Sequence, residues 1–228
     1  MNKVLLSCPS RGRPDLLRRM VDSFYETVSF GTKLVIYLDD DDPRLSEYAI
    51  LNNEIIQTIV GKRMNVAQIH NLIATWNMDY EYYMPINDDI IFRTKSWDII
   101  LSETIKIKGD DWGISYGDDL TNNNAFNLPT FGMLSGNIVR TLGHVYPLEL
   151  KALFGDTYLL DIGRAIGKLF YCSDVIIEHK QPGFYIKEDV RISEEFDKLE
   201  RDAYAKYIDN NLDNDVKKLF NAIVESNM

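Results

Sequence analysis

Short apolar runs alternate with segments of helical periodicity from the start of the chain to about residue 90. Residues 4–8, 33–38, 54–60 and 80–86 combine β-branched, aromatic and other apolar side chains, which predicts four buried strands. Apolar residues recur at spacings of three and four after the first and third runs, which predicts two helices with one apolar face each. These residues are Leu16, Leu17, Met20, Val21, Phe24 and Val28, and then Val66, Ile69, Leu72, Ile73 and Trp76. The alternation predicts an α/β fold with a mostly parallel sheet, whose ligands gather at the carboxyl ends of the strands.

Loops of unusual composition follow the predicted strands, and acidic residues dominate two of them. Asp88 and Asp89 follow the fourth strand directly, and two adjacent carboxylates at the rim of a sheet need a compensating positive charge, most simply a divalent cation. A solvated Asn-Asp-Asp turn is the alternative for residues 87–89. Four consecutive acids at 39–42 cannot lie in a core, so we expect them to face water or a ligand, with a solvated loop accounting for most of them.

The second half of the chain is less regular and favours an α+β arrangement. Glycines between aromatic residues in 112–137 suit either the close approach of a ligand or bends at a sheet edge. The predicted elements are helices at 96–106 and after 154–156, strands at 169–172 and 175–178 that end at His179, and helices within 187–228. We expect the last helices to pack on the domain and to have no part in the chemistry.

Length and composition indicate one folded, soluble domain. The chain has 228 residues, 45% hydrophobic and 26% charged, which is enough for one sizeable core. The N-terminus lacks the features of a leader and no apolar stretch reaches about 18 residues, so we expect a cytoplasmic protein without a membrane span. Cys8 and Cys172 are far apart, which favours free thiols in a reducing compartment.

Charge is distributed unevenly along the chain. The net charge of −10 disfavours general attraction to nucleic acid or anionic lipid. Residues 1–20 nevertheless hold five basic side chains against the single acid Asp15. We therefore expect a local anion site near the first loop, and a phosphate would suit it.

The ordered set of loops resembles the GT-A glycosyltransferases, enzymes that use nucleotide sugars and have an abridged Rossmann-like fold. Compact virus-encoded members are closest in size, and the pattern is also similar to family 2-like members. The matching elements are residues 9–14, the acids at 39–42, residues 61–71, Asn87-Asp88-Asp89 in place of the family's Asp-x-Asp motif, residues 154–156 in place of its late acidic motif, and His179 after the last strand. The resemblance implies a GT-A domain at 1–183 and a C-terminal helical extension at 184–228 packed on the same domain.

The resemblance implies a metal site at Asp89 and His179. Carboxylate oxygen and neutral imidazole suit manganese, with magnesium as the alternative. For His179 a purely structural role is the competing interpretation. Asn87 and Asp88 would contact the ribose or the water shell of the metal. Asn87 stands where the family has its first aspartate, which removes one negative charge and leaves the division of labour between Asp88 and Asp89 open.

The resemblance also implies a nucleotide-sugar site. Asp39 matches the family acid that receives the nucleobase or ribose, and by analogy with many members we expect a UDP-sugar, with guanine as the open alternative. Basic side chains would stabilise the charge that develops on the departing nucleoside diphosphate, and the candidates are Arg11, Arg13, Lys62 and Arg63. The residues expected to contact the nucleotide sugar are Pro9, Ser10, Arg11, Arg13, Asp39, Arg63, Asn71, Asn87 and Asp88.

Asp156 matches the general base of inverting family members, which removes a proton from the acceptor hydroxyl. Its alternative role is to cap the helix that follows. Phe154-Gly155 departs from the acid that the family usually has beside this base. In a retaining enzyme Asp156 would instead bind the donor or acceptor sugar.

Two other functions fit the same pattern. A nucleotidyltransferase that makes nucleotide sugars is one, although its usual Gly-rich, lysine-containing phosphate loop is replaced by the short run 10–13. A non-catalytic nucleotide- or sugar-binding module is the other. For a glycosyltransferase the acceptor hydroxyl is most simply that of a glycan, with a lipid-linked sugar, a protein side chain or a modified base in DNA as alternatives. The acidity of the chain counts against duplex DNA.

Overall fold

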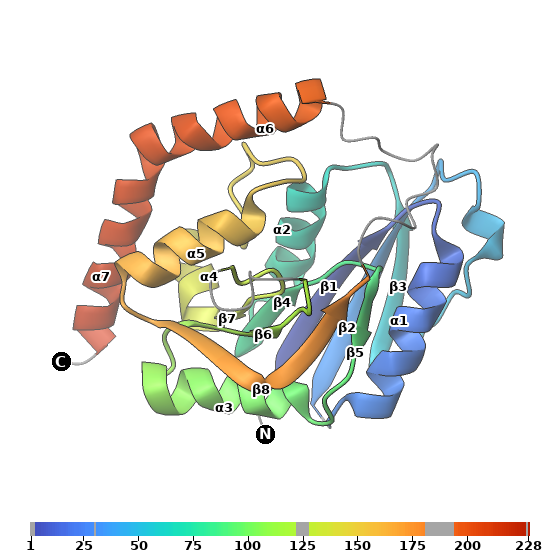
Figure 1. Cartoon of the computed structure of the whole chain (residues 1–228), viewed down its shortest axis with the longest axis horizontal. Coiled ribbons are helices and arrows are strands. Elements are labelled where there is room, and N and C mark those ends of the chain that lie inside the picture. The colour runs from blue at the N-terminus through green and yellow to red at the C-terminus, as the bar shows by residue number, and fades with distance from the viewer. Residues whose placement is uncertain (1–2, 30, 122–127, 181–193, 227) are drawn as a thin grey trace.

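The fold is built on one eight-stranded mixed sheet flanked by helices (Figure 1). The computed structural model describes residues 3–29, 31–121, 128–180, 194–226 and 228. The strand order is β3-β2-β1-β4-β7-β6-β8-β5. The first four strands, all mutually parallel, are β1 (Val4–Ser10), β2 (Thr32–Asp39), β3 (Ile56–Gly61) and β4 (Tyr82–Pro85). The predicted α/β fold with a mostly parallel sheet is therefore confirmed.

The other half of the sheet mixes directions. It contains β5 (Ile90–Phe92), β6 (Ile114–Asp118), β7 (Met133–Ser135) and β8 (Leu169–His179). Strand β7 is antiparallel to both β4 and β6, whereas β8 runs parallel to β6 and antiparallel to β5. The prediction of two strands at 169–172 and 175–178 is wrong, because one continuous strand spans both segments and lies between β6 and β5. A register shift between Tyr116 and Asp118 marks an irregularity in its pairing with β6.

Helices cover both faces of the sheet, and the alternation of side chains along β1 shows why. Val4 and Leu6 pack in one core cluster with Phe24 of α1 (Pro14–Thr27), whereas Leu5 packs in the opposite cluster with Ile73 of α2 (Val66–Trp76). Strands that are buried on both faces consist of continuous apolar runs. The remaining helices are α3 (Trp97–Gly109) on the α1 face, and α4 (Gly136–Leu142), α5 (Gly155–Ala165), α6 (Glu194–Tyr207) and α7 (Asp213–Ser226) on the α2 face.

Helix α2 begins where its sequence dictates. The Asn65 side chain accepts a hydrogen bond from the Gln68 backbone at 2.9 Å, and the Gln68 side chain accepts one from the Asn65 backbone at 3.1 Å. This reciprocal capping box satisfies two N–H groups at the helix terminus. The predicted apolar face of α2 is correct except at Trp76, which is 58% exposed.

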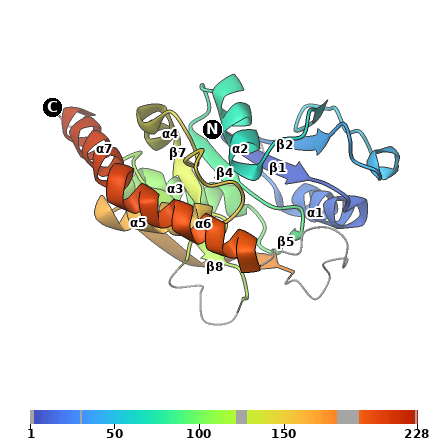
Figure 2. The same cartoon turned by 90° about the horizontal axis from the view of Figure 1, so that it is seen from above.

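The C-terminal helices pack on the same body as the sheet, as Figure 2 shows for α6 above α5. Leu219 and Ile223 of α7 lie in the core cluster of the α2 face, and Tyr158 of α5 donates a hydrogen bond to Asp215 at 3.1 Å. The proposed boundary at residues 183 and 184 lies outside the described residues, so the division into 1–183 and 184–228 stays a prediction. Among the helices that the structure describes, none is both long and apolar enough to cross a bilayer.

Gly117 of β6 packs closely against Val175 of β8. A Cβ added at Gly117 would lie 2.5 Å from the carbonyl oxygen of Val175 and 2.8 Å from its Cγ1. We predict that Gly117→Ala lowers the free energy of unfolding by ~1–3 kcal/mol, because the two strands must move apart. Denaturant unfolding measures this, with Ser173→Ala at an exposed position of β8 as the control. Equal stability of wild type and Gly117→Ala would contradict the packing described.

Candidate active site

The carboxyl ends of the four parallel strands bring the predicted loops to one edge of the sheet. Asp39, the last residue of β2, is in register with Gly61 at the end of β3, and Ser10 at the end of β1 is in register with Leu38. Strand β4 lies on the other side of β1 and runs into Asn87. The expected convergence of these loops is therefore present in the fold.

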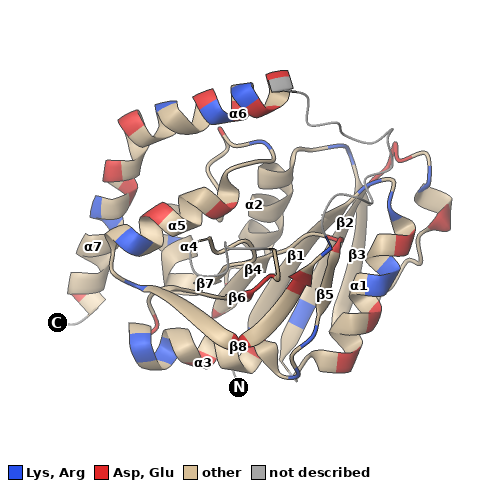
Figure 3. Ribbon diagram, viewed as in Figure 1, with Lys and Arg blue, Asp and Glu red and all other residues tan. Residues whose placement is uncertain are grey.

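Arg11 and Asp39 meet at this edge. Arg11 Nη1 lies 3.2 Å from Asp39 Oδ2 and also contacts Asp41. Asp39 is 6% exposed, and its Oδ1 is buried without a hydrogen-bond partner among the described residues. Burial raises the pKa of Asp39, and Arg11 opposes this shift, with a smaller contribution from the exposed Arg63. Figure 3 shows acidic and basic residues side by side at this end of the sheet.

The four consecutive acids do not form a mainly solvated loop. Asp40 and Asp41 are exposed, but Asp39 and Asp42 are buried. Asp42 Oδ2 accepts a hydrogen bond from the Gly12 backbone at 2.6 Å, and its Oδ1 accepts one from the Arg44 backbone at 2.8 Å. The expectation that solvation accounts for most of the four is therefore wrong, because Asp42 ties the first loop to the second.

Asp88 is held inside the protein. It is 0% exposed, accepts a hydrogen bond from Ser10 Oγ at 2.5 Å, and lies 2.8 Å from Arg13 Nη2. Burial raises the pKa of Asp88 to about 6, against the opposing effects of Arg13 and Ser10. Arg13 also lies 3.6 Å from Asp89 Oδ2. A protein cation therefore supplies part of the positive charge that the adjacent carboxylates require.

Asp89, in the turn between β4 and β5, faces His179 at the end of β8. Asp89 Oδ1 and His179 Nε2 are 3.5 Å apart, and both atoms are buried without a hydrogen-bond partner among the described residues. Burial raises the pKa of Asp89, but His179 and Arg13 more than offset this effect, so the net shift is downward. Burial lowers the pKa of His179, and the Asp89 carboxylate reverses this shift. A carboxylate and an imidazole that face each other in this way fit a shared divalent cation.

The described part of the chain does not offer a complete set of protein ligands for such an ion. No cluster of three or more His, Cys, Asp or Glu side chains suited to a metal occurs among the described residues. Manganese and magnesium sites in nucleotide-dependent enzymes commonly use one or two protein ligands and take the others from phosphates and water. The pair therefore fits a metal that binds together with a diphosphate.

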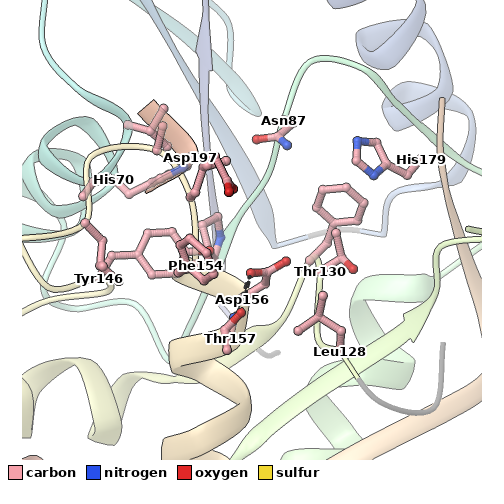
Figure 4. Close-up of a pocket in the computed structure, with 18 of the residues that line it drawn as sticks. His70, Asn87, Leu128, Thr130, Tyr146, Phe154, Asp156, Thr157, His179 and Asp197 are labelled. Carbon is pink, nitrogen blue, oxygen red and sulfur yellow. Dashed lines mark hydrogen bonds between the residues drawn. The ribbon is translucent and has the colours of Figure 1, made fainter. Parts of the chain in front are cut away.

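A cavity of about 450 Å³ opens next to His179 (Figure 4). Asn87 and Asp156 also line it, so three of the predicted site residues share one space. Its walls come from α2, the end of β4, the residues before and within the start of α5, and α6. Its other lining residues include Val66, Ala67, His70, Leu128, Thr130, Phe131, Tyr146, Phe154, Thr157, Asp197 and Arg201.

Asp156 lies in the first turn of α5 and points into this cavity (Figure 4). The helix cap is Phe154, in a left-handed conformation with φ 62, and Asp156 Oδ1 accepts a hydrogen bond from the next residue, Thr157, at 2.7 Å. The alternative that Asp156 is the capping residue is therefore wrong. Burial raises the pKa of Asp156, and the Thr157 hydrogen bonds oppose this shift. A carboxylate with a raised pKa is a stronger base once it is ionised.

Other predicted site residues do not line the cavity. Asn71 uses its amide to hold the backbone of the adjacent segment: its Oδ1 accepts from Val145 at 2.8 Å and from Tyr146 at 3.1 Å, and its Nδ2 donates to the Tyr146 carbonyl at 2.7 Å. Within the described chain, the cavity lining also does not include Pro9, Ser10, Arg11, Arg13, Asp39, Arg63, Asp88 or Asp89.

Sequence reasoning missed several cavity residues. His70 lies on the buried face of α2, in line with Ile69 and Ile73, where a histidine is hard to distinguish from a core residue. Asp197 and Arg201 belong to α6, which we expected to have no part in the site. Amphipathic spacing shows that α6 is a packed helix, but it does not show which loop the helix contacts.

Solved structures share this fold, although no protein-family model and no curated protein matches the chain. TarS 1-349 from S. aureus in complex with UDP-GlcNAc has a TM-score of 0.63 and 10% identity, over 96% of this chain and 72% of that one. The mannosyltransferase PcManGT from Pyrobaculum calidifontis, in complex with GDP-Man and Mn2+, has a TM-score of 0.60 and 12% identity, over 98% and 74%. Both are GT-A glycosyltransferases. The chain has a GT-A fold. The fold prediction is confirmed, and the GT-A likeness extends over nearly all of the chain.

His70 provides a pH-dependent test of the cavity wall of this GT-A fold. It is 2% exposed, its Nδ1 is 2.6 Å from Ser7 Oγ, and burial lowers its pKa to about 3. In the unfolded chain a histidine has a pKa of about 6.5. As the pH falls below about 6.5, the unfolded state takes up a proton that the folded state does not, so stability is lost, at up to about 1.4 kcal/mol per pH unit.

We predict that His70→Gln removes this contribution. As the pH falls from about 6.5 to 4.5, the free energy of unfolding of the wild type should fall more steeply than that of the variant. The difference in slope should reach up to about 1.4 kcal/mol per pH unit, the value for uptake of one proton. Urea unfolding at a series of pH values measures both curves. Parallel curves would show that His70 is not kept neutral by burial.

Proposed function

We propose that the protein is a glycosyltransferase that moves a sugar from a nucleoside-diphosphate sugar, most simply a UDP-sugar, to an acceptor hydroxyl with inversion at the anomeric carbon. One observation supports this proposal more than any other. His179 lies 3.5 Å from Asp89 on one side and lines the same cavity as Asp156 on the other. A candidate metal pair and a candidate base therefore lie beside one space, as group transfer from a diphosphate requires.

The donor would lie along the carboxyl edge of the sheet. Asp39, with an unpartnered buried oxygen, would receive the ribose or the base, and Arg11 and Arg13 would lie near the diphosphate. Asp89 and His179 would hold a divalent cation, manganese by the chemistry of the ligands, with magnesium as the alternative. A bound cation supplies positive charge next to the departing diphosphate.

The acceptor would occupy the cavity beside Asp156. The Asp156 carboxylate would accept the proton of the acceptor hydroxyl while that oxygen attacks the anomeric carbon and the bond to the diphosphate breaks. The cavity volume is within the ordinary range for small-ligand sites. Its aromatic residues Phe131, Tyr146 and Phe154 suit stacking on a sugar ring. The charged residues in its lining include the acids Asp156 and Asp197, which would repel a polyanion. This lining favours a glycan hydroxyl over a polyanion such as DNA.

The two competing functions predict different outcomes in simple assays. A nucleotidyltransferase would form the nucleotide sugar from a sugar phosphate and a nucleoside triphosphate. A binding module would bind nucleoside diphosphates without turnover. Calorimetry with UDP and GDP, with and without manganese, followed by a donor-hydrolysis and acceptor-transfer assay, separates a glycosyltransferase from both; incubation with a sugar phosphate and a nucleoside triphosphate then separates the two alternatives from each other. Transfer or hydrolysis of a nucleotide sugar is the result expected.

Asp89→Ala removes the charged member of the candidate metal pair. We predict that manganese-dependent binding of a nucleoside diphosphate weakens strongly, by ~10-fold or more, because a metal ligand is lost. Asp118→Ala, at the end of β6, is the control and should bind like the wild type. Calorimetric titration measures each affinity. Equal affinity of the wild type in chelator and in manganese would refute the metal site.

Asp156→Asn keeps the shape of the side chain and removes its basicity. We predict that folding and donor binding are preserved while turnover falls by ~10²-fold or more, the usual scale of a general-base contribution. Transfer assays measure turnover, and proton NMR of the product reports the anomeric configuration. Wild-type turnover by Asp156→Asn, or a product that retains the donor's configuration, would show that Asp156 is not the base.

A further inference from the structure

Helix α6 holds one wall of the cavity through a buried carboxylate. Glu200 is 2% exposed, and its Oε2 accepts hydrogen bonds from three consecutive backbone N–H groups. The donors are Lys151, Ala152 and Leu153, at 2.8, 2.9 and 3.1 Å. Hydrogen bonds to an ionised group are stronger than neutral ones, and successive N–H groups form a concave site for an anion. The contact is therefore a strong anchor between α6 and this loop.

The anchored loop leads directly to Asp156. Residues 151–154 form bends outside the described strands and helices, so no sheet or helix ladder fixes them. On the other side, the Val66 backbone at the start of α2 donates a hydrogen bond to the Lys151 carbonyl at 2.9 Å. Glu200 and α2 thus both hold the loop by hydrogen bonds, three to five residues before Asp156.

Neighbouring side chains of α6 hold the last residue of the same loop. The Tyr204 ring stacks on Phe154 with centroids 5.6 Å apart and an interplanar angle of 11°. The Arg201 guanidinium lies over the Phe154 ring, 5.4 Å from its centroid. Phe154 caps α5, so its position sets where the first turn of α5, and with it Asp156, begins.

We propose that Glu200 is a positioning residue for Asp156. Glu200 would fix the loop that sets the direction of the Asp156 carboxylate in the cavity, and it would act on turnover without contacting the donor. This inference rests on the proposed function, because it assigns a role in the reaction of Asp156. Under this proposal α6 helps to position the catalytic carboxylate, in addition to packing on the domain.

A double-mutant cycle tests the proposal. Glu200→Gln removes the charge at nearly constant shape, and we expect kcat to fall by ~10-fold or more while the donor KM changes little, because a small displacement of a catalytic group lowers rate more than binding. In the Asp156→Asn background, Glu200→Gln should have almost no further effect, since the group it positions is already inactive. Glu195→Gln, at an exposed position of the same helix, is the matched control and should leave kcat unchanged.

A purely structural role predicts another pattern. In that case Glu200→Gln would lower the melting temperature and the active fraction, and its effect on kcat would be the same in both backgrounds; that result would overturn the proposal. If Glu200→Gln does not fold, Glu200→Asp, which keeps the charge and shortens the side chain, enters the same cycle with the same expectation. A wild type that transfers no sugar would refute the proposed function itself, whereas an active wild type with an additive cycle would refute only the role of Glu200.

Discussion

The structure of the candidate site depends on the neutralisation of buried carboxylates at the ends of parallel strands. Asp88 and Asp89 lie at 0% and 4% exposure, where an isolated pair of negative charges would be very unfavourable. Arg13 reaches both carboxylates, Ser10 donates to Asp88, and His179 faces Asp89. These contacts join the first loop, the turn after β4 and the end of β8. The need to neutralise Asp88 and Asp89 therefore determines where these three segments, distant in the sequence, meet.

The same requirement explains the two halves of the proposed reaction. Arg13 lies closer to Asp88 than to Asp89, and one oxygen of each carboxylate, together with Nε2 of His179, has no hydrogen-bond partner among the described residues. That incomplete pairing is the structural basis for placing a cation there. His179 also lines the cavity that Asp156 faces, where the acceptor would bind, and α6 contributes to the wall of this cavity. His179 would thus contribute both to the metal site that binds the donor and to the cavity that binds the acceptor.

Much of the fold could be predicted because its information is local. Strands buried on both faces have continuous apolar sequences, and apolar residues recur at regular spacing within the helices between them. The four parallel strands, and the edge where their loops meet, can therefore be predicted from the sequence. Asn87, Asp156 and His179 were grouped in one site by the family resemblance, and in the structure all three line one cavity.

The remaining features depend on contacts between distant segments. Whether Asp42 is solvated depends on Gly12, whether β8 is one strand depends on its pairing with β6 on one side and β5 on the other, and whether α6 reaches the site depends on Glu200 and the loop at 151–153. Asn71 illustrates the same limit. Its three hydrogen bonds to residues 145 and 146 are invisible in the sequence around it.

The central claim is that Asp89 and His179 hold a metal that binds together with the nucleotide. Crystals grown with UDP and manganese, measured at a wavelength where manganese scatters anomalously, test it most directly. The account predicts an anomalous peak between Asp89 and His179, in contact with the diphosphate. UDP bound at the carboxyl edge without a peak at this pair, or with the peak at other residues, would contradict it.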